Sequence, residues 1–166
     1  MIERPKIEIK CTQTDKIVEA VGYLTLVVFW VMNAVAFSDL PEIIPIHYNG
    51  AGEVDGYGSR TTIFLLPIIG TLLFTMLTVL NKYPENFNYM VAITEENAEK
   101  QYANATRMIR FLKLVLVVLF FLIDFCTIQT SKEKMAGLGP WFLPILIVSI
   151  LMLIGYFSYQ SYRLKK

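Results

Sequence analysis

Four apolar runs constrain the fold of this chain more than any other feature of its sequence. A run of about 20 apolar residues forms a helix of about 30 Å, which matches the hydrocarbon core of a bilayer. None of the runs alternates with the period of two that a barrel strand requires, so a helix is the spanning form that satisfies the backbone within each run. The sequence therefore predicts four transmembrane helices, at residues 17–37, 61–80, 111–128 and 140–159.

The composition agrees with an integral membrane protein. Of the 166 residues, 55% are hydrophobic and 17% are charged, whereas about a quarter of the residues of a soluble domain are charged. The formal net charge of +1 gives no basis for binding nucleic acid. We expect an all-α integral membrane protein in which residues 1–166 form one domain, a four-helix bundle whose partner is the lipid bilayer.

The placement of lysine and arginine predicts how the bundle is oriented. Twelve of the 15 basic residues lie in the two tails and in the connection that leads into the third helix, and three lie in the other two connections. Because basic residues accumulate on the cytoplasmic side of a membrane, both termini are expected to be cytoplasmic. The outer loop then covers residues 38–60, and the cytoplasmic segment covers residues 81–110.

Two helix starts are predicted from local signals. Thr14 and Asp15 are candidate N-cap residues for the first helix. Thr94 is followed by acidic residues, which predicts a helix from about Glu95 that continues without a break into the third transmembrane helix. The cytoplasmic segment is therefore expected to be partly helical.

Two further features are predicted within the first two helices. Pro67 and Gly70 predict a bend in the second helix, where neighbouring helices would satisfy the freed carbonyl. Glu19 lies one turn after Lys16 and is expected to pair with it near the inner boundary of the membrane.

The outer loop is predicted to be an ordered cap. Pro41 and Pro45 stiffen its first half into an extended run. Its second half carries four glycines, which permit the positive φ angles and close backbone approaches of a compact turn. Tyr48, Val54 and Tyr57 give the loop apolar groups to bury. Ordered loops on a rigid scaffold often form binding surfaces.

Three side chains of the loop carry chemistry: His47, Glu53 and Asp55. Their spacing matches neither a zinc signature nor the ladder of a calcium loop, so we assign no metal and no cofactor. His47 can act as an acid or base near neutral pH, or it can be a structural hydrogen-bonding residue, and the sequence leaves both roles open. No nucleophile motif is present, so no catalytic residue is assigned.

Two polar residues lie at a similar depth within the apolar runs, Asn33 in the first and Asp124 in the third. An ionised carboxylate at this depth is costly unless it is paired or hydrated. In one interpretation, Asn33 and Asp124 form an outward-opening polar pocket with His47 and Arg60. In the other, Asp124 reaches the interface and pairs with one of the two lysines that follow the third helix. The sequence leaves both interpretations open.

Residues 40–60, LPEIIPIHYNGAGEVDGYGSR, resemble the hallmark of a bacterial membrane family known as domain of unknown function 1648. Residues 93–113 also resemble the cytoplasmic stretch of stand-alone members. The resemblance implies a protein of the bacterial inner (cytoplasmic) membrane and supplies no established reaction. The pattern is carried by Leu40, Pro41, Pro45, His47, Asn49, Gly52, Asp55, Gly56, Ser59 and Arg60.

The same module occurs at the start of SdpI-type proteins, which give immunity to a secreted killing factor and signal to a repressor. Those proteins have additional helices, so the resemblance transfers this role only loosely. Together with Glu53, the pattern residues from Pro45 to Arg60 are our candidates for binding a partner or organising the loop. Asn33 and Asp124 are the candidates within the membrane.

The function expected from the sequence is binding rather than catalysis. We expect a multi-pass inner-membrane protein, with a binding, accessory or immunity-signalling role, whose outer loop recognises a partner or a lipid. One alternative is a membrane enzyme that acts on an envelope lipid or peptide. Another is an accessory subunit of a larger envelope complex. The expected partners are accordingly the bilayer and another membrane or envelope protein, and not nucleic acid.

Overall fold

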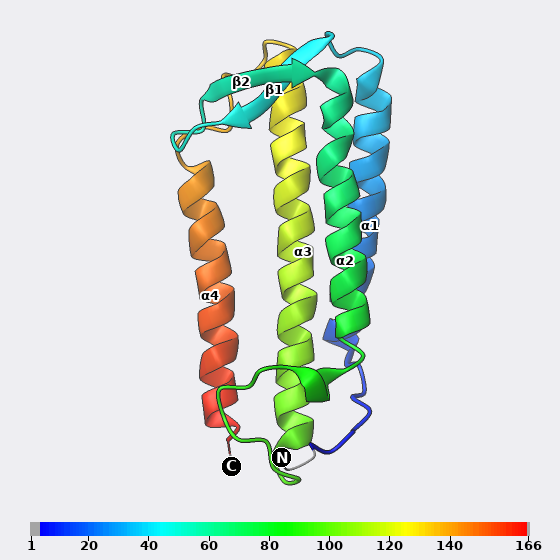
Figure 1. Cartoon of the computed structure of the whole chain (residues 1–166), viewed down its shortest axis with the longest axis vertical. Helices are drawn as coiled ribbons and strands as arrows, with labels where there is room; N and C mark the ends of the chain where they lie inside the picture. The colour runs from blue at the N-terminus through cyan, green and yellow to red at the C-terminus, as the bar shows by residue number, and fades with distance from the viewer. Residues whose placement is uncertain (1–3, 166) are drawn as a thin grey trace.

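The computed structural model describes residues 4–165 and contains four long helices (Figure 1). Each is long and apolar enough to cross a membrane, α2 together with the 3-10 turn that precedes it. The predicted four-helix transmembrane bundle is therefore confirmed, and the chain is a multi-pass membrane protein. The helices and this turn are α1 (Gln13–Phe37), η1 (Arg60–Phe64), α2 (Leu65–Leu80), α3 (Ala98–Ser131) and α4 (Phe142–Arg163).

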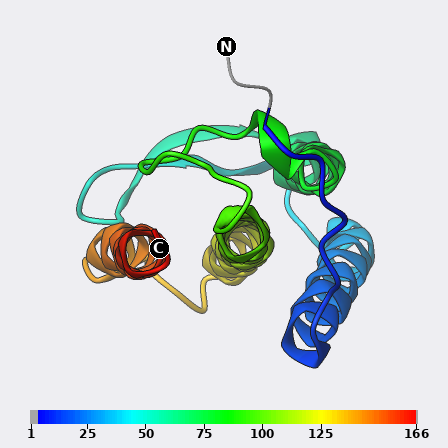
Figure 2. The ribbon, with the colours of Figure 1, turned by 90° about the horizontal axis from the view of Figure 1, so that it is seen from below.

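Helix α3 is the centre of the bundle. Helices α1, α2 and α4 each pack against it, and the view along the helices shows α3 between α1 and α4 (Figure 2). In the middle of the bundle, Leu26, Phe74 and Val117 join α1, α2 and α3 in one buried cluster. Gly22 lets the Phe74 ring approach α1, because a Cβ added there would lie 2.7 Å from Cε2 of Phe74.

A β-hairpin covers the end of the bundle that carries residues 38–60, which we call the outer end (Figure 1). Strands β1 (Ile43–Tyr48) and β2 (Val54–Ser59) pair in the antiparallel direction and lie across the helix ends. The ordered loop is confirmed, but the all-α prediction missed that it consists of strands. Beneath the hairpin, Ile44 of β1 belongs to a buried apolar cluster with Ala36, Leu40, Ile63 and Ile128.

Helix α3 begins at Ala98, three residues later than the predicted start at about Glu95. Thr94 and Asn97 hold the turn that precedes it. The amide of Thr94 donates to Oδ1 of Asn97 at 3.0 Å, and the amide of Asn97 donates to Oγ1 of Thr94 at 3.3 Å. From Ala98 the helix runs for 34 residues without a break, so the prediction of one long helix entering the membrane is confirmed.

Helix α1 begins earlier than predicted. Its N-cap is Thr12 rather than Thr14 or Asp15. Asp15 completes a capping box by accepting a hydrogen bond from the amide of Thr12 at 2.8 Å. Oδ1 of Asp15 also lies 2.8 Å from Nε of Arg107, so the start of α1 is fixed to α3.

The predicted ion pair between Lys16 and Glu19 is wrong. Glu19 pairs with α3 instead: its Oε2 lies 2.6 Å from Nζ of Lys113, and its Oε1 lies 3.3 Å from Nε of Arg110. The Lys113 side chain is 1% exposed, and it also donates to Oγ1 of Thr78 at 2.7 Å. Helices α1, α2 and α3 therefore share one charged network near the inner end.

Pro67 lies in the first turn of α2, where the chain changes from 3-10 to α-helical geometry. A proline has no N–H to donate to the carbonyl four residues earlier, which here belongs to Ile63. Asn33 of α1 supplies a donor in its place, with Nδ2 at 3.2 Å from the carbonyl oxygen of Ile63. Near the bend predicted at Pro67 and Gly70, the structure has a change in helix type that α1 stabilises, and the bend itself stays a prediction.

Helix α4 is tied to α3 near its inner end. Gln101, which is fully buried, donates to the carbonyl of Ser161 at 2.8 Å and accepts from Oγ of Ser161 at 2.7 Å. Asn104 donates to the carbonyl of Phe157 at 3.0 Å. Nearer the middle of α4 the large apolar side chains are exposed, as at Met152, which is 70% exposed.

Candidate functional site

The turn of the hairpin is organised by Asn49. Its Oδ1 accepts hydrogen bonds from the amides of Ala51 (2.9 Å) and Glu53 (3.1 Å), and its Nδ2 donates to Oε2 of Glu53 (3.0 Å). Gly52 completes the turn with a φ of +76°, a conformation that favours glycine. Asn49, Gly52 and Glu53 therefore build the turn of the loop.

The tip of the hairpin is docked on the connection between α3 and α4. The carbonyl of Gly52 accepts from the amides of Leu138 (2.8 Å) and Gly139 (3.4 Å), and Glu53 forms an antiparallel bridge with Gly137. A side chain has no room at this contact, because a Cβ added to Gly52 would collide with the carbonyl of Gly139. Gly52 thus fixes the hairpin to the segment that leads into α4.

The base of the hairpin is held by Ser59 and Arg60. Oγ of Ser59 caps η1 by accepting from the amide of Thr61 at 3.4 Å. Arg60 donates from Nη1 to the carbonyl of Leu40 at 3.1 Å, and its guanidinium carbon lies 4.9 Å from the centre of the Phe37 ring. The structure therefore places Arg60 at the base of the hairpin, and it does not bring Arg60 to Asp124.

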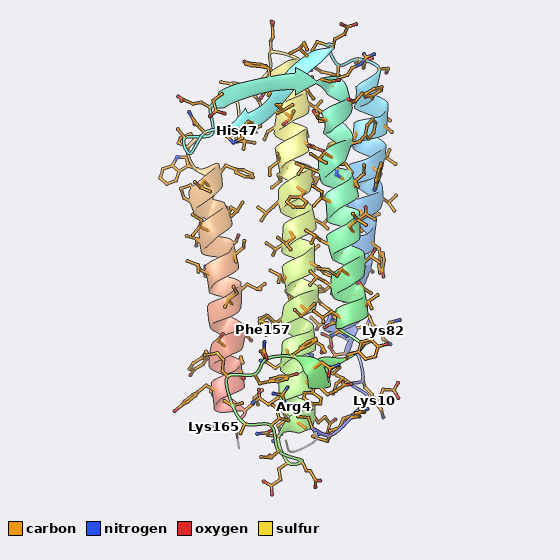
Figure 3. All side chains as sticks on the ribbon, viewed as in Figure 1. Arg4, Lys10, His47, Lys82, Phe157 and Lys165 are labelled. Carbon is orange, nitrogen blue, oxygen red and sulfur yellow. The ribbon has the colours of Figure 1, made fainter. Side chains whose placement is uncertain are left out.

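His47 lies on the hairpin, at the outer end of the molecule (Figure 3), and it forms a pair with Asp55 of β2. Nδ1 of His47 lies 2.5 Å from Oδ1 of Asp55, and their side chains are 71% and 43% exposed. Gly56 lies opposite His47, where a Cβ would be 3.0 Å from Cβ of His47. Pro45 lies opposite Tyr57, and each strand of a two-stranded sheet has a free edge that tolerates proline. An exposed pair adds little stability, so the fold alone does not account for His47 and Asp55.

A cleft of about 430 Å³ lies beneath the hairpin, between β1, the start of α2 and the outer part of α3. Two of its lining residues, Ile46 and Leu65, are 49% and 54% exposed and form part of its rim. Asp124 of α3 is 4% exposed and lies in its wall. The cleft is therefore mostly apolar, with a few polar groups. Its other lining residues are Ile44, Pro45, His47, Tyr48, Thr62, Ile63, Leu66, Ile123, Thr127 and Leu138.

Asp124 is buried against Asn33. Nδ2 of Asn33, which is fully buried, donates to Oδ2 of Asp124 at 2.7 Å. The alternative pairing with a lysine is not formed within residues 4–165, because Lys132 pairs with Asp39 at 3.6 Å and Asp124 has no ion-pair partner. The structure thus brings Asn33 and Asp124 together and places Asp124 in the same cleft as the strand that carries His47.

Tyr48 has a polar role that is not predicted from the sequence. Its phenol oxygen lies 2.8 Å from Oγ1 of Thr127, and either hydroxyl can donate. Burial raises the pKa of the Tyr48 phenol, so the group stays protonated and able to donate. Thr127 follows Asp124 by three residues, a spacing that puts both on one face of α3 and that could have indicated a shared site. The hydroxyl pair and the carboxylate accordingly line one cleft.

The family model described as Domain of unknown function (DUF1648) matches residues 24–71. This match confirms the resemblance seen in the sequence. The matched segment covers most of α1, the hairpin, η1 and the first turns of α2. It therefore includes Asn33 and two of the three sides of the cleft, whereas Asp124 and Thr127 come from α3, outside the match.

A protein from the archaeon Archaeoglobus fulgidus, described as an uncharacterized protein, is 31% identical to this chain over 85 residues. The matched region is 46% of this chain and 46% of that protein, so it spans about half the length of each. No solved structure matches the chain. These comparisons support the family resemblance of residues 24–71 and assign no activity to them.

Proposed function

We propose, for a chain whose residues 24–71 match the family model of domain of unknown function 1648, that the cleft beneath the hairpin binds an amphiphilic ligand at the outer face of the membrane. One observation carries the proposal: a cleft of about 430 Å³ combines an apolar, exposed rim with a carboxylate buried in its wall. Protein sites for small ligands have volumes of roughly 300–1,000 Å³, with apolar walls and a few polar groups that orient the ligand. The cleft fits this description.

The rim of the cleft suits a ligand that comes from the membrane. Ile46 and Leu65 are about half exposed, and Leu65 belongs to a helix long and apolar enough to span the bilayer. Covering these side chains with an acyl chain or an apolar peptide side chain removes their surface from water, which is favourable. The polar groups of the wall then contact the head of the ligand.

The proposed location is the bacterial inner (cytoplasmic) membrane, with both termini in the cytoplasm and the cleft outside. The distribution of basic residues supports this orientation. Arg4, Lys10, Lys82 and Lys165 lie at the end of the molecule opposite His47 (Figure 3), and basic residues favour the cytoplasmic side. The family resemblance supports a bacterial membrane, and the archaeal relative shows that similar chains also occur in archaea.

A membrane enzyme that acts on an envelope lipid or peptide is the second candidate. The distance of 2.5 Å between His47 and Asp55 favours it, because a carboxylate that orients an imidazole is a common arrangement for a general base. The replacement His47→Asn separates the two candidates. It should abolish turnover by an enzyme, whereas a protein that only binds has no turnover to lose and keeps the contacts of its ligand with Asp124 and the apolar walls.

The proposed function is tested by purifying the tagged protein in mild detergent and identifying bound lipids, peptides and proteins by mass spectrometry. Two variants of α2 are compared with wild type: Leu66→Trp, in the cleft, and Leu72→Trp, at a residue that is 65% exposed and does not line the cleft. We expect wild type and Leu72→Trp to carry a stoichiometric ligand and Leu66→Trp to lose it, because the indole fills the cleft.

Equal ligand content in all three proteins would contradict the proposal. A protein partner retained at fixed stoichiometry by all three would support an accessory or immunity-signalling role instead, since such a partner would contact the hairpin rather than the cleft.

A further inference from the structure

We infer that the ligand of the cleft is a membrane lipid whose head carries a primary ammonium group, held by the Asp124 carboxylate. The inference rests on the proposed function and adds the chemical class of the ligand.

Asp124 has an unused acceptor. Its Oδ2 accepts from Nδ2 of Asn33 at 2.7 Å, and the other hydrogen of that amide goes to the carbonyl of Ile63 at 3.2 Å. Within residues 4–165, Oδ1 of Asp124 accepts no hydrogen bond, although Asp124 lines the cleft. Oδ1 is not completely buried, so a ligand that brings an N–H group into the cleft can reach it and gains this hydrogen bond.

Asp124 also lacks a counter-charge. An ionised carboxylate at membrane depth is costly unless a cation pairs with it, and in the described part of the chain Asp124 takes part in no ion pair. Two basic residues of the outer end are used elsewhere: Lys132 pairs with Asp39, and Arg60 donates to the carbonyl of Leu40. A cationic ligand supplies the missing charge.

The outer surface attracts cations as well. The segments 38–60 and 132–141 carry an excess of acidic over basic residues, which raises the local concentration of cations near the cleft. The acidic residues are Asp39, Glu42, Glu53, Asp55 and Glu133, and the basic residues are Arg60, Lys132 and Lys134.

A lipid fits the cleft better than a basic peptide does. The exposed rim at Ile46 and Leu65 is apolar, and a basic peptide would place several charges against it, at a desolvation cost. A lipid brings one ammonium and apolar chains. Beside Asp124, the hydroxyls of Tyr48 and Thr127 share one hydrogen bond at 2.8 Å, which uses one of their two hydrogens. The remaining O–H can donate to the phosphate next to the ammonium.

The ammonium is primary because the cleft offers a hydrogen-bond acceptor rather than an aromatic cage. A quaternary ammonium has no N–H and is recognised by several aromatic faces, whereas Tyr48 is the one phenyl-type ring among the residues that line the cleft. Phosphatidylethanolamine and phosphatidylcholine share the phosphate and differ in this property, so they form a matched pair of probes.

The test reconstitutes the protein in vesicles of equimolar phosphatidylethanolamine and phosphatidylcholine with identical acyl chains, and compares the retained lipids by native mass spectrometry. A hydrogen bond to a charged group is worth enough for a preference of about tenfold or more, so wild type should favour phosphatidylethanolamine by that factor. Asp124→Asn keeps the size of the side chain and its contact with Asn33, and should retain both lipids equally. Glu42→Gln removes an exposed acid outside the cleft that takes part in no ion pair of the described residues, and it should keep the preference.

Equal retention of the two lipids by wild type would overturn the inference without the use of any variant. A preference that persists in Asp124→Asn would also overturn it, as would recovery of a basic peptide in place of either lipid. If wild type retains both lipids equally and Leu66→Trp retains neither, the inference fails while the proposed function stands. If Leu66→Trp retains as much lipid as wild type, the proposed function itself fails.

Discussion

At the scale of single residues, Lys113 is a buried charge whose ammonium group needs partners within the bundle. Its side chain is 1% exposed within the bundle, and its Nζ lies 2.6 Å from Oε2 of Glu19 and 2.7 Å from Oγ1 of Thr78. It also lies 4.3 Å from the centre of the Phe74 ring. These contacts replace the hydration that the ammonium loses on burial. Because they come from α1 and α2, one side chain of α3 joins three helices.

Replacing Glu19 with Gln should destabilise the bundle by about 3 kcal/mol, because it leaves the buried Lys113 without its counter-charge. Thermal unfolding of the purified protein in detergent measures the effect. Glu8→Gln, at an exposed residue, is the control and should leave the midpoint unchanged. Adding Lys113→Met to Glu19→Gln should recover most of the loss, since an apolar side chain needs no partner. A double variant as unstable as Glu19→Gln alone would show that the charge of Lys113 is not the cause.

Single residues also show which contacts can be predicted from the sequence and which cannot. The similar depth of Asn33 and Asp124 could be predicted, because helical rise converts position along a run into depth, and the two side chains do meet. The partner of Glu19 could not, because pairing with Lys113 depends on how α1 and α3 are rotated about their axes. A sequence shows directly only neighbours on the same helix, which is why it predicts Lys16 as the partner.

At the scale of elements, the hairpin shows why an ordered loop could be predicted but its strands could not. The prolines and glycines indicated a compact cap. However, β2 reads VDGYGS, and glycine and aspartate are depleted in strands. The pairing is stabilised instead by contacts from outside the hairpin, such as the docking of Gly52 on Leu138 and the buried Ile44. Tertiary contacts therefore override the local preference.

Replacing Gly52 with Ala should loosen the hairpin, because alanine is strained at a φ of +76° and its Cβ collides with Gly139. A loss of about 1–3 kcal/mol in local stability is expected. Hydrogen exchange of residues 43–59 measures it. Gly50→Ala is a matched control, since a Cβ at Gly50 meets no atom within 4 Å. Equal exchange in the two variants would contradict the role given to Gly52.

Replacing Gln101 with Leu should release the inner end of α4. The change removes both hydrogen bonds with Ser161 and leaves the Ser161 hydroxyl buried without its partner, at a cost of about 1–3 kcal/mol. Faster hydrogen exchange in residues 155–165, with unchanged exchange in α1, is the expected result. Gln160→Leu, which removes an exposed contact with Tyr156 on α4 itself, serves as the control. Unchanged exchange in α4 would mean that other contacts hold it.

At the scale of the whole molecule, the distribution of charge predicts the orientation in the membrane. In a Cys11→Ser, Cys126→Ser background, Gly50→Cys should react with a membrane-impermeant maleimide in intact cells, because the proposed topology places the hairpin turn outside. Met90→Cys, at a residue that is 80% exposed in the connection between α2 and α3, should react only after the membrane is permeabilised. The reverse pattern would invert the proposed topology and place the cleft in the cytoplasm.

The two attachments of α4 predict that the molecule responds to the thickness of its bilayer. Helix α4 is tied to α3 through Gln101 at the inner end, and the segment that leads into it is tied to the hairpin tip through Gly52 at the outer end. With 22 residues it is about 33 Å long. In a thinner bilayer a helix of fixed length tilts. A tilt of α4 would displace the hairpin, which covers the cleft. We therefore expect ligand retention to vary with the acyl-chain length of the host membrane.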